Sequence, residues 1–91
     1  MPSGQEMTDI ARRLIWWQEP EAALANQTRF LAQVMTLGTW REVQTVKDVL
    51  GWEAFREVLK DAPAGVFDGR SWTYWHGFFG LPEPEMPKRV L

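Results

Sequence analysis

The chain has 91 residues, a net charge of −2 and no cysteine. This length fits one small domain, and the lack of excess Lys and Arg disfavours binding to a phosphate backbone. Without cysteine, a disulfide framework and a thiolate metal site are excluded. The first residues lack the basic start and apolar core of a secretory signal, and the early apolar run at 14–17 is too short to span a bilayer. We therefore expect a cytoplasmic protein.

Aromatic side chains dominate the composition, with six Trp, five Phe and one Tyr. A buried ring removes roughly 150 to 250 Å² from water, so these residues should carry much of the core. A domain of this size has room for about one central layer, because small chains bury only about 60% of their extended surface. Some rings should therefore stay exposed, and exposed aromatic clusters usually mark interfaces.

The first helix is predicted from apolar residues that recur at steps of three and four. These residues are Met7, Ile10, Leu14 and Trp17. The pattern predicts a helix that ends near Gln18 and directs this stripe into the core. Pro20 suits the first turn of a new helix, and the run that follows it, as far as Ala25, is rich in helix-forming residues.

Asn26 can interrupt that run and cap the next helix. The apolar stripe of this next helix consists of Phe30, Leu31, Val34 and Met35. Gly38 follows it, and we expect this glycine to end the helix in the left-handed conformation.

The strongest local signal is the capping box Thr39-Trp40-Arg41-Glu42. The Thr39 hydroxyl can accept from the Glu42 amide while the Glu42 carboxylate reaches back to the Thr39 amide, so a helix should begin at Trp40. Its predicted buried face is Trp40, Val43, Val46 and Leu50, with Val49 beside them and Gly51 at the end.

The next segment repeats the helical spacing after Gly51 and ends before Pro63. Its apolar residues are Trp52, Phe55, Val58 and Leu59. On the opposite side, Glu53 with Arg56 and Glu57 with Lys60 are spaced to form ion pairs along the helix.

The last helix should be capped by Asp68 or Ser71 and end at Gly80. One side carries Trp72, Trp75, His76 and Phe79, whereas Tyr74 and Phe78 fall on the other. The sequence therefore predicts an all-α domain of four to five short helices over residues 1–80. Prolines at 82, 84 and 87 predict an extended, largely solvated tail over 81–91.

Catalysis and metal binding have little support in this sequence. His76 is the single histidine, and neither Ser3 nor Ser71 lies in a nucleophile motif. Glu53 and Glu57 are one helical turn apart, but nothing near them completes a metal shell. We expect no enzyme activity, no cofactor and no metal.

A helix-turn-helix is the alternative, because residues 39–60 form two short helices joined at Gly51. Glu53 and Glu57 on the second helix would repel phosphates, which disfavours nucleic acid. A DNA-binding transcriptional autoregulator therefore remains the second hypothesis.

Protein binding is the favoured function, because three aromatics fall outside the predicted core stripes. These predicted anchors are Trp16, Tyr74 and Phe78. Alternatively, the segment from Pro20 to Ala25 folds over Trp16. Cations that could supply contacts at the rim are Arg12, Arg13 and Arg70, together with Lys88 and Arg89 in the tail. The same aromatics would also serve a homodimer.

Several of these motifs together resemble a family of small bacterial helical proteins of uncharacterised function. They are Arg29-Phe30-Leu31 with Val34, Gly38-Thr39-Trp40 with Val43, Leu50-Gly51 with Phe55 and Leu59, and Ser71-Trp72 with Trp75 and Gly80-Leu81. The resemblance covers about residues 14–81. Members are often neighbours of AbiEii-type nucleotidyltransferase toxins, which implies an antitoxin that blocks such a toxin sterically. The chain departs from the family at Trp17-Gln18, where an acidic residue is expected, although Glu19 stands close by. The resemblance supplies no catalytic residue.

Overall fold

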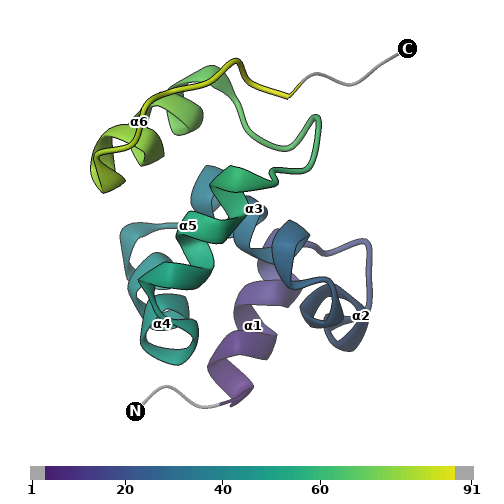
Figure 1. Cartoon of the computed structure of the whole chain (residues 1–91). Helices are drawn as coiled ribbons and strands as arrows, with labels where there is room; N and C mark the ends of the chain where they lie inside the picture. The colour runs from purple at the N-terminus through teal and green to yellow at the C-terminus, as the bar shows by residue number, and fades with distance from the viewer. Residues whose placement is uncertain (1–3, 88–91) are drawn as a thin grey trace.

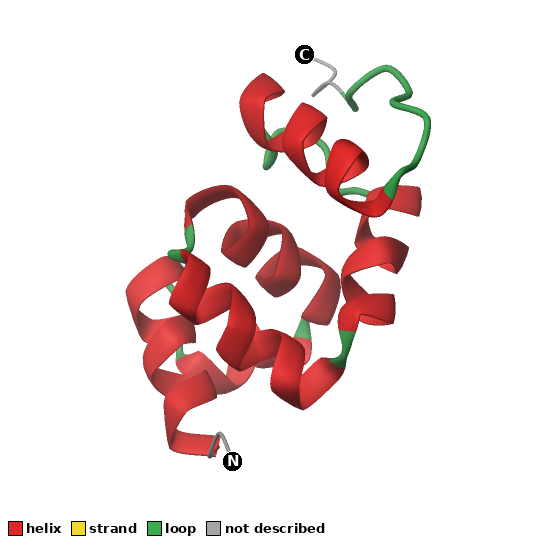
Figure 2. Cartoon of the chain, turned by 90° about the vertical axis from the view of Figure 1, so that its left-hand side faces the viewer, coloured by secondary structure: helices red, strands yellow, loops and turns green. Residues whose placement is uncertain are grey.

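The computed structural model describes residues 4–87 and has six α-helices with no strand in that range. The helices are α1 (Gly4–Leu14), α2 (Pro20–Ala25), α3 (Gln27–Leu37), α4 (Trp40–Leu50), α5 (Trp52–Lys60) and α6 (Gly69–Phe79). The predicted all-α class is confirmed. Figures 1 and 2 show α6 at one end of the molecule, with the other helices packed together beside it. None of the helices in this range is long and apolar enough to cross a membrane.

Helix α3 is the centre of the fold, because it contacts all five other helices. Six consecutive residues from Phe30 to Met35 are buried, so the helix is enclosed on every side and not on one stripe alone. Residues 4–87 form six helices and not the predicted four to five, because the short run after Pro20 is a helix of its own, separated from α3 by Asn26. Its side chain accepts a hydrogen bond from the backbone N–H of Arg29 at 3.2 Å.

The prediction for the end of the first helix was wrong. Helix α1 stops at Leu14, and the chain turns over residues 15–18, where the N–H of Gln18 donates to the carbonyl of Ile15 at 3.2 Å. This turn places Ile15 in the core, with 1% of its surface exposed, and leaves Trp17 52% exposed. The helical stripe ends at Leu14, and Ile15 takes the place in the core that was expected for Trp17.

Gly38 ends α3, but in an extended conformation with φ −73° and not in the predicted left-handed one. Glycine is needed here because a Cβ atom would lie 2.6 Å from the carbonyl oxygen of Val34. The capping box that follows is confirmed. The Glu42 carboxylate accepts from the Thr39 amide at 2.8 Å, and the Thr39 hydroxyl accepts from the Glu42 amide at 3.2 Å.

The predicted buried face of α4 is only partly buried. Val43 and Val46 are in the core, but Trp40 is 47% exposed and Val49 is 46% exposed. Trp40 lies in the first turn of the helix, where its indole stacks on that of Trp52 at 6.4 Å and not inside the core.

The last two helices begin and end close to where the sequence predicts. Gly51 separates α4 from α5 with φ 84°, and the two expected ion pairs form on α5 at 3.3 and 3.2 Å. Asp68 caps α6 by accepting from the backbone N–H of Ser71 at 2.7 Å. Gly80 ends α6 in the left-handed conformation.

The tail from Leu81 to Pro87 is extended and mostly exposed, as predicted, but it also contacts the rest of the chain. It runs back along α6 (Figure 1), where the indole N–H of Trp72 donates to the carbonyl of Pro84 at 2.8 Å. Leu81 and Met86 pack against the core. The tail docks because Trp72 is buried and its N–H requires an acceptor. The predicted contact residues Lys88 and Arg89 lie outside the described residues.

Candidate functional site

Helix α6 is held against α3 by one buried hydrogen bond over a long sequence separation. The indole N–H of Trp75 donates to the carbonyl of Met35 at 2.8 Å. Met35 lies in the last turn of α3, where carbonyl groups have no partner within the helix. The indole therefore satisfies a backbone group that would otherwise be buried without a hydrogen bond, and it fixes the position of α6 beside α3.

A cluster of rings extends this contact into the interior. The ring of Trp75 lies 5.9 Å from that of Phe55 and 6.4 Å from that of Trp52, both on α5. Trp75 and Phe55 are almost fully buried, and Trp52 is partly buried against the core. Because packed aromatic pairs of this kind stabilise by about 0.5 to 1.5 kcal/mol beyond their buried area, the cluster is a firm support for the residues above it.

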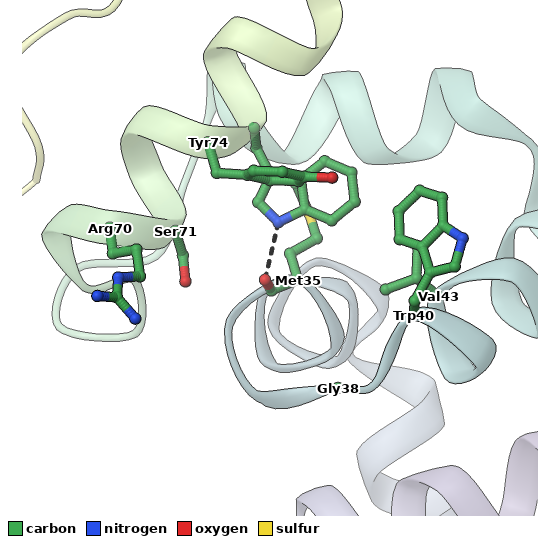
Figure 3. Close-up of a pocket in the computed structure, with 8 residues that line it drawn as sticks. Met35, Gly38, Trp40, Val43, Arg70, Ser71 and Tyr74 are labelled. Carbon is green, nitrogen blue, oxygen red and sulfur yellow. Dashed lines mark hydrogen bonds between the residues drawn. The ribbon is translucent and has the colours of Figure 1, made fainter.

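An open groove lies on this support, between the end of α3, the start of α4 and the first turns of α6. Its volume is about 220 Å³. We name it the aromatic groove, and its lining residues are Met35, Gly38, Trp40, Val43, Arg70, Ser71, Tyr74 and Trp75. Figure 3 shows Trp40 at one end and Arg70 with Ser71 at the other, with Tyr74 above the groove.

Three half-exposed rings form a continuous surface at this groove, which we name the aromatic face. They are Trp40, Tyr74 and Phe78, with 47%, 51% and 42% of their surfaces exposed. Phe78 lies between the other two, 6.0 Å from the ring of Trp40 and 6.1 Å from that of Tyr74. Because Tyr74 and Phe78 are one helical turn apart on α6, the helix holds both on the same side.

The charge at the groove is carried by Arg70, since none of the eight lining residues is acidic. The nearest carboxylate along the chain is Asp68, which is engaged as the cap of α6. The pKa of Asp68 is lowered mainly by its hydrogen bond from the Ser71 backbone, and to a smaller extent by the charge of Arg70. Among residues 4–87, Arg70 takes part in none of the five ion pairs.

The structure brings together three of the predicted site residues, Arg70, Tyr74 and Phe78, and places Trp16 elsewhere. Trp16 lies in the turn between α1 and α2, and it is not among the residues that line the aromatic groove. It is 76% exposed, so the segment from Pro20 does not cover it. Its ring meets that of Trp17 at 5.7 Å, edge to face.

The two arginines of α1 are engaged within the chain. Arg12 pairs with Asp9 at 3.5 Å on the same helix. Arg13 forms a two-pronged ion pair with Glu42, with its Nε 2.7 Å from one carboxylate oxygen. The hydrogen bond between them lowers the pKa of Glu42 and raises that of Arg13. Arg13 therefore acts as a link between α1 and the capping box of α4.

Sequence reasoning missed Trp40 as a member of the exposed surface. Its helical position agrees with the core stripe of α4, so periodicity assigns it to the interior. The capping box could have indicated that Trp40 is exposed. A residue directly after the cap lies at the end of its helix, where only a neighbouring element can bury it. That element is α6, and the interior position there is taken by Trp75.

His76, Glu53 and Glu57, which were weighed for catalysis, metal binding or DNA binding, are used in packing and ion pairs, and Ser3 lies outside the described residues. His76 is buried, and its Nδ1 donates to the carbonyl of Trp72 at 2.7 Å. On α5, the exposed carboxylates of Glu53 and Glu57 pair with Arg56 and Lys60. Within residues 4–87, no group of three or more His, Asp or Glu side chains is placed to hold a metal ion.

Comparison of the chain with models of protein families, with curated proteins and with solved structures finds no match. The family resemblance therefore stays a prediction.

Proposed function

We propose that this chain is a protein-binding module and that the aromatic face is its docking surface. The observation that carries this proposal is the contact of three half-exposed rings, Trp40, Tyr74 and Phe78, on a buried aromatic support. Exposed rings gathered in this way keep apolar surface in water, and a partner that covers them gains the free energy of removing that surface.

The size of the groove favours a protein partner over a small molecule. Its volume of about 220 Å³ is below the roughly 300 to 1,000 Å³ of typical small-molecule sites. A groove of this size suits one anchoring side chain, with the surrounding rings covered by the rest of an interface. Trp and Tyr are also the residue types most often found to dominate binding energy in protein interfaces.

The family resemblance suggests one candidate partner. In this narrower form of the proposal, the partner is a nucleotidyltransferase toxin and the chain is its antitoxin. The aromatic face would cover the nucleotide or acceptor site of the toxin and exclude its substrate. Co-expression with the products of the flanking genes tests this directly, since rescue of growth requires the aromatic face if the proposal holds.

Two double variants test the docking surface itself. Tyr74→Ala with Phe78→Ala removes two rings from the aromatic face, whereas Trp16→Ala with Trp17→Ala removes two exposed rings from the other side. Once a partner co-purifies with the wild-type chain, calorimetric titration of purified proteins gives the dissociation constant for each variant. We expect the first variant to bind about 30-fold or more weakly, as loss of interface hot spots does.

The second double variant should bind within about twofold of the wild type, as truncation outside an interface does. Equal affinities for the two double variants would remove the aromatic face as the docking surface. Sedimentation of the isolated chain tests whether a second copy of the chain covers the aromatic face. A dimer that dissociates only in the variant of Tyr74 and Phe78 would show that the surface serves self-association.

A further inference from the structure

The aromatic groove differs in charge from the chain as a whole. The net charge of the chain is −2, but the lining residues include one guanidinium and no carboxylate. Figure 3 shows Arg70 at the end of the groove remote from Trp40. The charge of Arg70 interacts with that of Asp68, but the Asp68 carboxylate caps α6 and Arg70 is in none of the five ion pairs of the described range. The guanidinium therefore keeps donors for a carboxylate that arrives here.

A second cation borders the aromatic face on its other side. The ammonium group of Lys47 lies 5.7 Å from the ring centre of Trp52, which in turn contacts the ring of Phe78 at 5.1 Å. Asp48 pairs with Lys47 at 2.7 Å and offsets part of its charge. Lys47 forms an ion pair with a carboxylate and Arg70 is in none of the five ion pairs of the described range, so Arg70 is the better site for an anionic group.

We propose that the groove binds a short acidic segment of the partner. A Leu or Phe side chain of that segment enters between Trp40 and Tyr74, and a neighbouring carboxylate pairs with Arg70. This inference rests on the proposed function and specifies the chemistry of the partner. A guanidinium can bind a carboxylate through two parallel hydrogen bonds, which gives direction as well as attraction, so the pair would fix the orientation of the segment.

Three synthetic peptides that differ only in charge test the inference. They are acetyl-EELFEE-amide, acetyl-QQLFQQ-amide and acetyl-KKLFKK-amide, titrated into the full isotope-labelled chain and followed by NMR. The acidic peptide should shift the indole signal of Trp40 and the amide signal of Tyr74, and should leave the indole signal of Trp16 in place. Its dissociation constant should be about tenfold lower than that of the neutral peptide, and the basic peptide should bind most weakly.

A matched pair of variants separates the role of Arg70 from that of overall charge. Arg70→Gln should bring the acidic peptide to within about twofold of the neutral one, since the charge-assisted pair is lost. Arg12→Gln changes the net charge equally but lies on α1, away from the groove, and should keep the preference. Both side chains are exposed, so both variants should fold, which circular dichroism verifies.

Several results would overturn the inference. They are equal affinity for the three peptides, no shift at Trp40 and Tyr74, or an equal loss of preference in both arginine variants. If the peptides show no charge preference while Tyr74→Ala with Phe78→Ala still loses the protein partner, the inference fails and the proposed function stands. If that double variant keeps its partner, the proposed function fails and the inference fails with it.

Discussion

The molecule exposes two aromatic clusters that differ in what supports them. Trp16 and Trp17 lie in a turn, are 76% and 52% exposed, and contact each other edge to face. Tyr74 and Phe78 are 51% and 42% exposed and lie on a helix, and Trp75 beneath them is almost fully buried. Exposure alone would rank the first pair higher as a docking site.

The packing beneath a ring is a better guide to a docking surface than its exposure. A surface that is already ordered loses little conformational entropy when a partner binds. Rings on a helix with a buried hydrogen bond beneath them are held in place before binding. The two rings of the turn contact each other and none of the buried rings, so less packing holds them before a partner binds. The comparison therefore favours the aromatic face over the tryptophan pair of the turn as the proposed docking surface.

Removing the Trp75 side chain, which lies beneath the aromatic face, should lower the stability of the protein the most. Trp75→Ala deletes a buried indole and should lower the free energy of unfolding by about 3 to 5 kcal/mol, as large-to-small core changes do. Trp75→Phe keeps most of the packing but leaves the Met35 carbonyl without its donor, which costs about 1 to 3 kcal/mol. Urea unfolding followed by circular dichroism measures both.

The Trp75 variants should also differ from the wild type in partner binding. Trp75→Phe should weaken partner binding although Tyr74 and Phe78 are unchanged, because α6 is less firmly held against α3. Full partner affinity in Trp75→Phe, at temperatures where the variant is folded, would show that the support does not matter and would remove the distinction drawn between the two clusters.

The start of α4, which positions Trp40, depends on Glu42. Glu42→Ala removes both the capping hydrogen bond to Thr39 and the ion pair with Arg13, and should cost about 1 to 2 kcal/mol of stability. Half of the Arg13 side chain is exposed, so solvent screens the ion pair and most of the loss comes from the cap. Thermal unfolding of wild type and variant gives the difference, and Glu42→Gln, which keeps the hydrogen-bonding geometry, should lose less.

The stabilisation that the Glu42 carboxylate contributes should also depend on pH. The pKa of Glu42 is lowered in the folded protein, chiefly by its hydrogen bond from Arg13. Protonation therefore favours the unfolded chain, so the stabilisation is fully present above the ordinary Glu pKa of about 4.3 and is lost as the pH falls through the lowered value. The stability difference between wild type and Glu42→Gln should be constant near neutral pH and shrink in acid. A difference that grows in acid would contradict the assignment.

The tail packs on α6 on the side opposite the groove. Substitutions at this contact should lower the stability of the protein less than those at Trp75. Trp72→Phe removes the hydrogen bond to the Pro84 carbonyl, worth about 0.5 to 1.5 kcal/mol, and should release the tail. A protease that cuts after Glu should then cleave at Glu85 several-fold faster. Thr73→Val, which removes a longer bond to Glu83 at 3.2 Å, is the milder comparison. Unchanged cleavage in Trp72→Phe would show that the tail is held by other contacts.

Local signals predicted most of this fold. Caps, glycines and ion pairs act within four residues of each other, so Thr39 with Glu42 and Glu53 with Arg56 could be placed from spacing alone. The exposure of Tyr74 and Phe78 also follows from spacing, because they lie opposite Trp72 on the helix.

Contacts between distant segments could not be predicted in this way. The bond from Trp75 to Met35 joins residues forty apart, and it decides that Trp75 takes the interior position and Trp40 the rim. The docking of Pro84 on Trp72 likewise depends on how the chain turns at Gly80. The candidate site was therefore predicted only in part, as Arg70, Tyr74 and Phe78, whereas the place of Trp40 beside them and the separation of Trp16 came from the structure.

The smallest effect is expected from the tryptophan pair of the turn. Trp16→Gln with Trp17→Gln should change the free energy of unfolding by no more than about 0.5 kcal/mol per site, since exposed substitutions away from caps and buried groups rarely do more. The two rings contact each other and stay largely in water, so little packing is lost. Chemical unfolding in urea checks this value, and peptide titration of the same variant should leave the aromatic groove fully competent. A loss as large as that of Trp75→Phe would mean that the turn is part of the core, and the ranking of the two clusters by their support would be wrong.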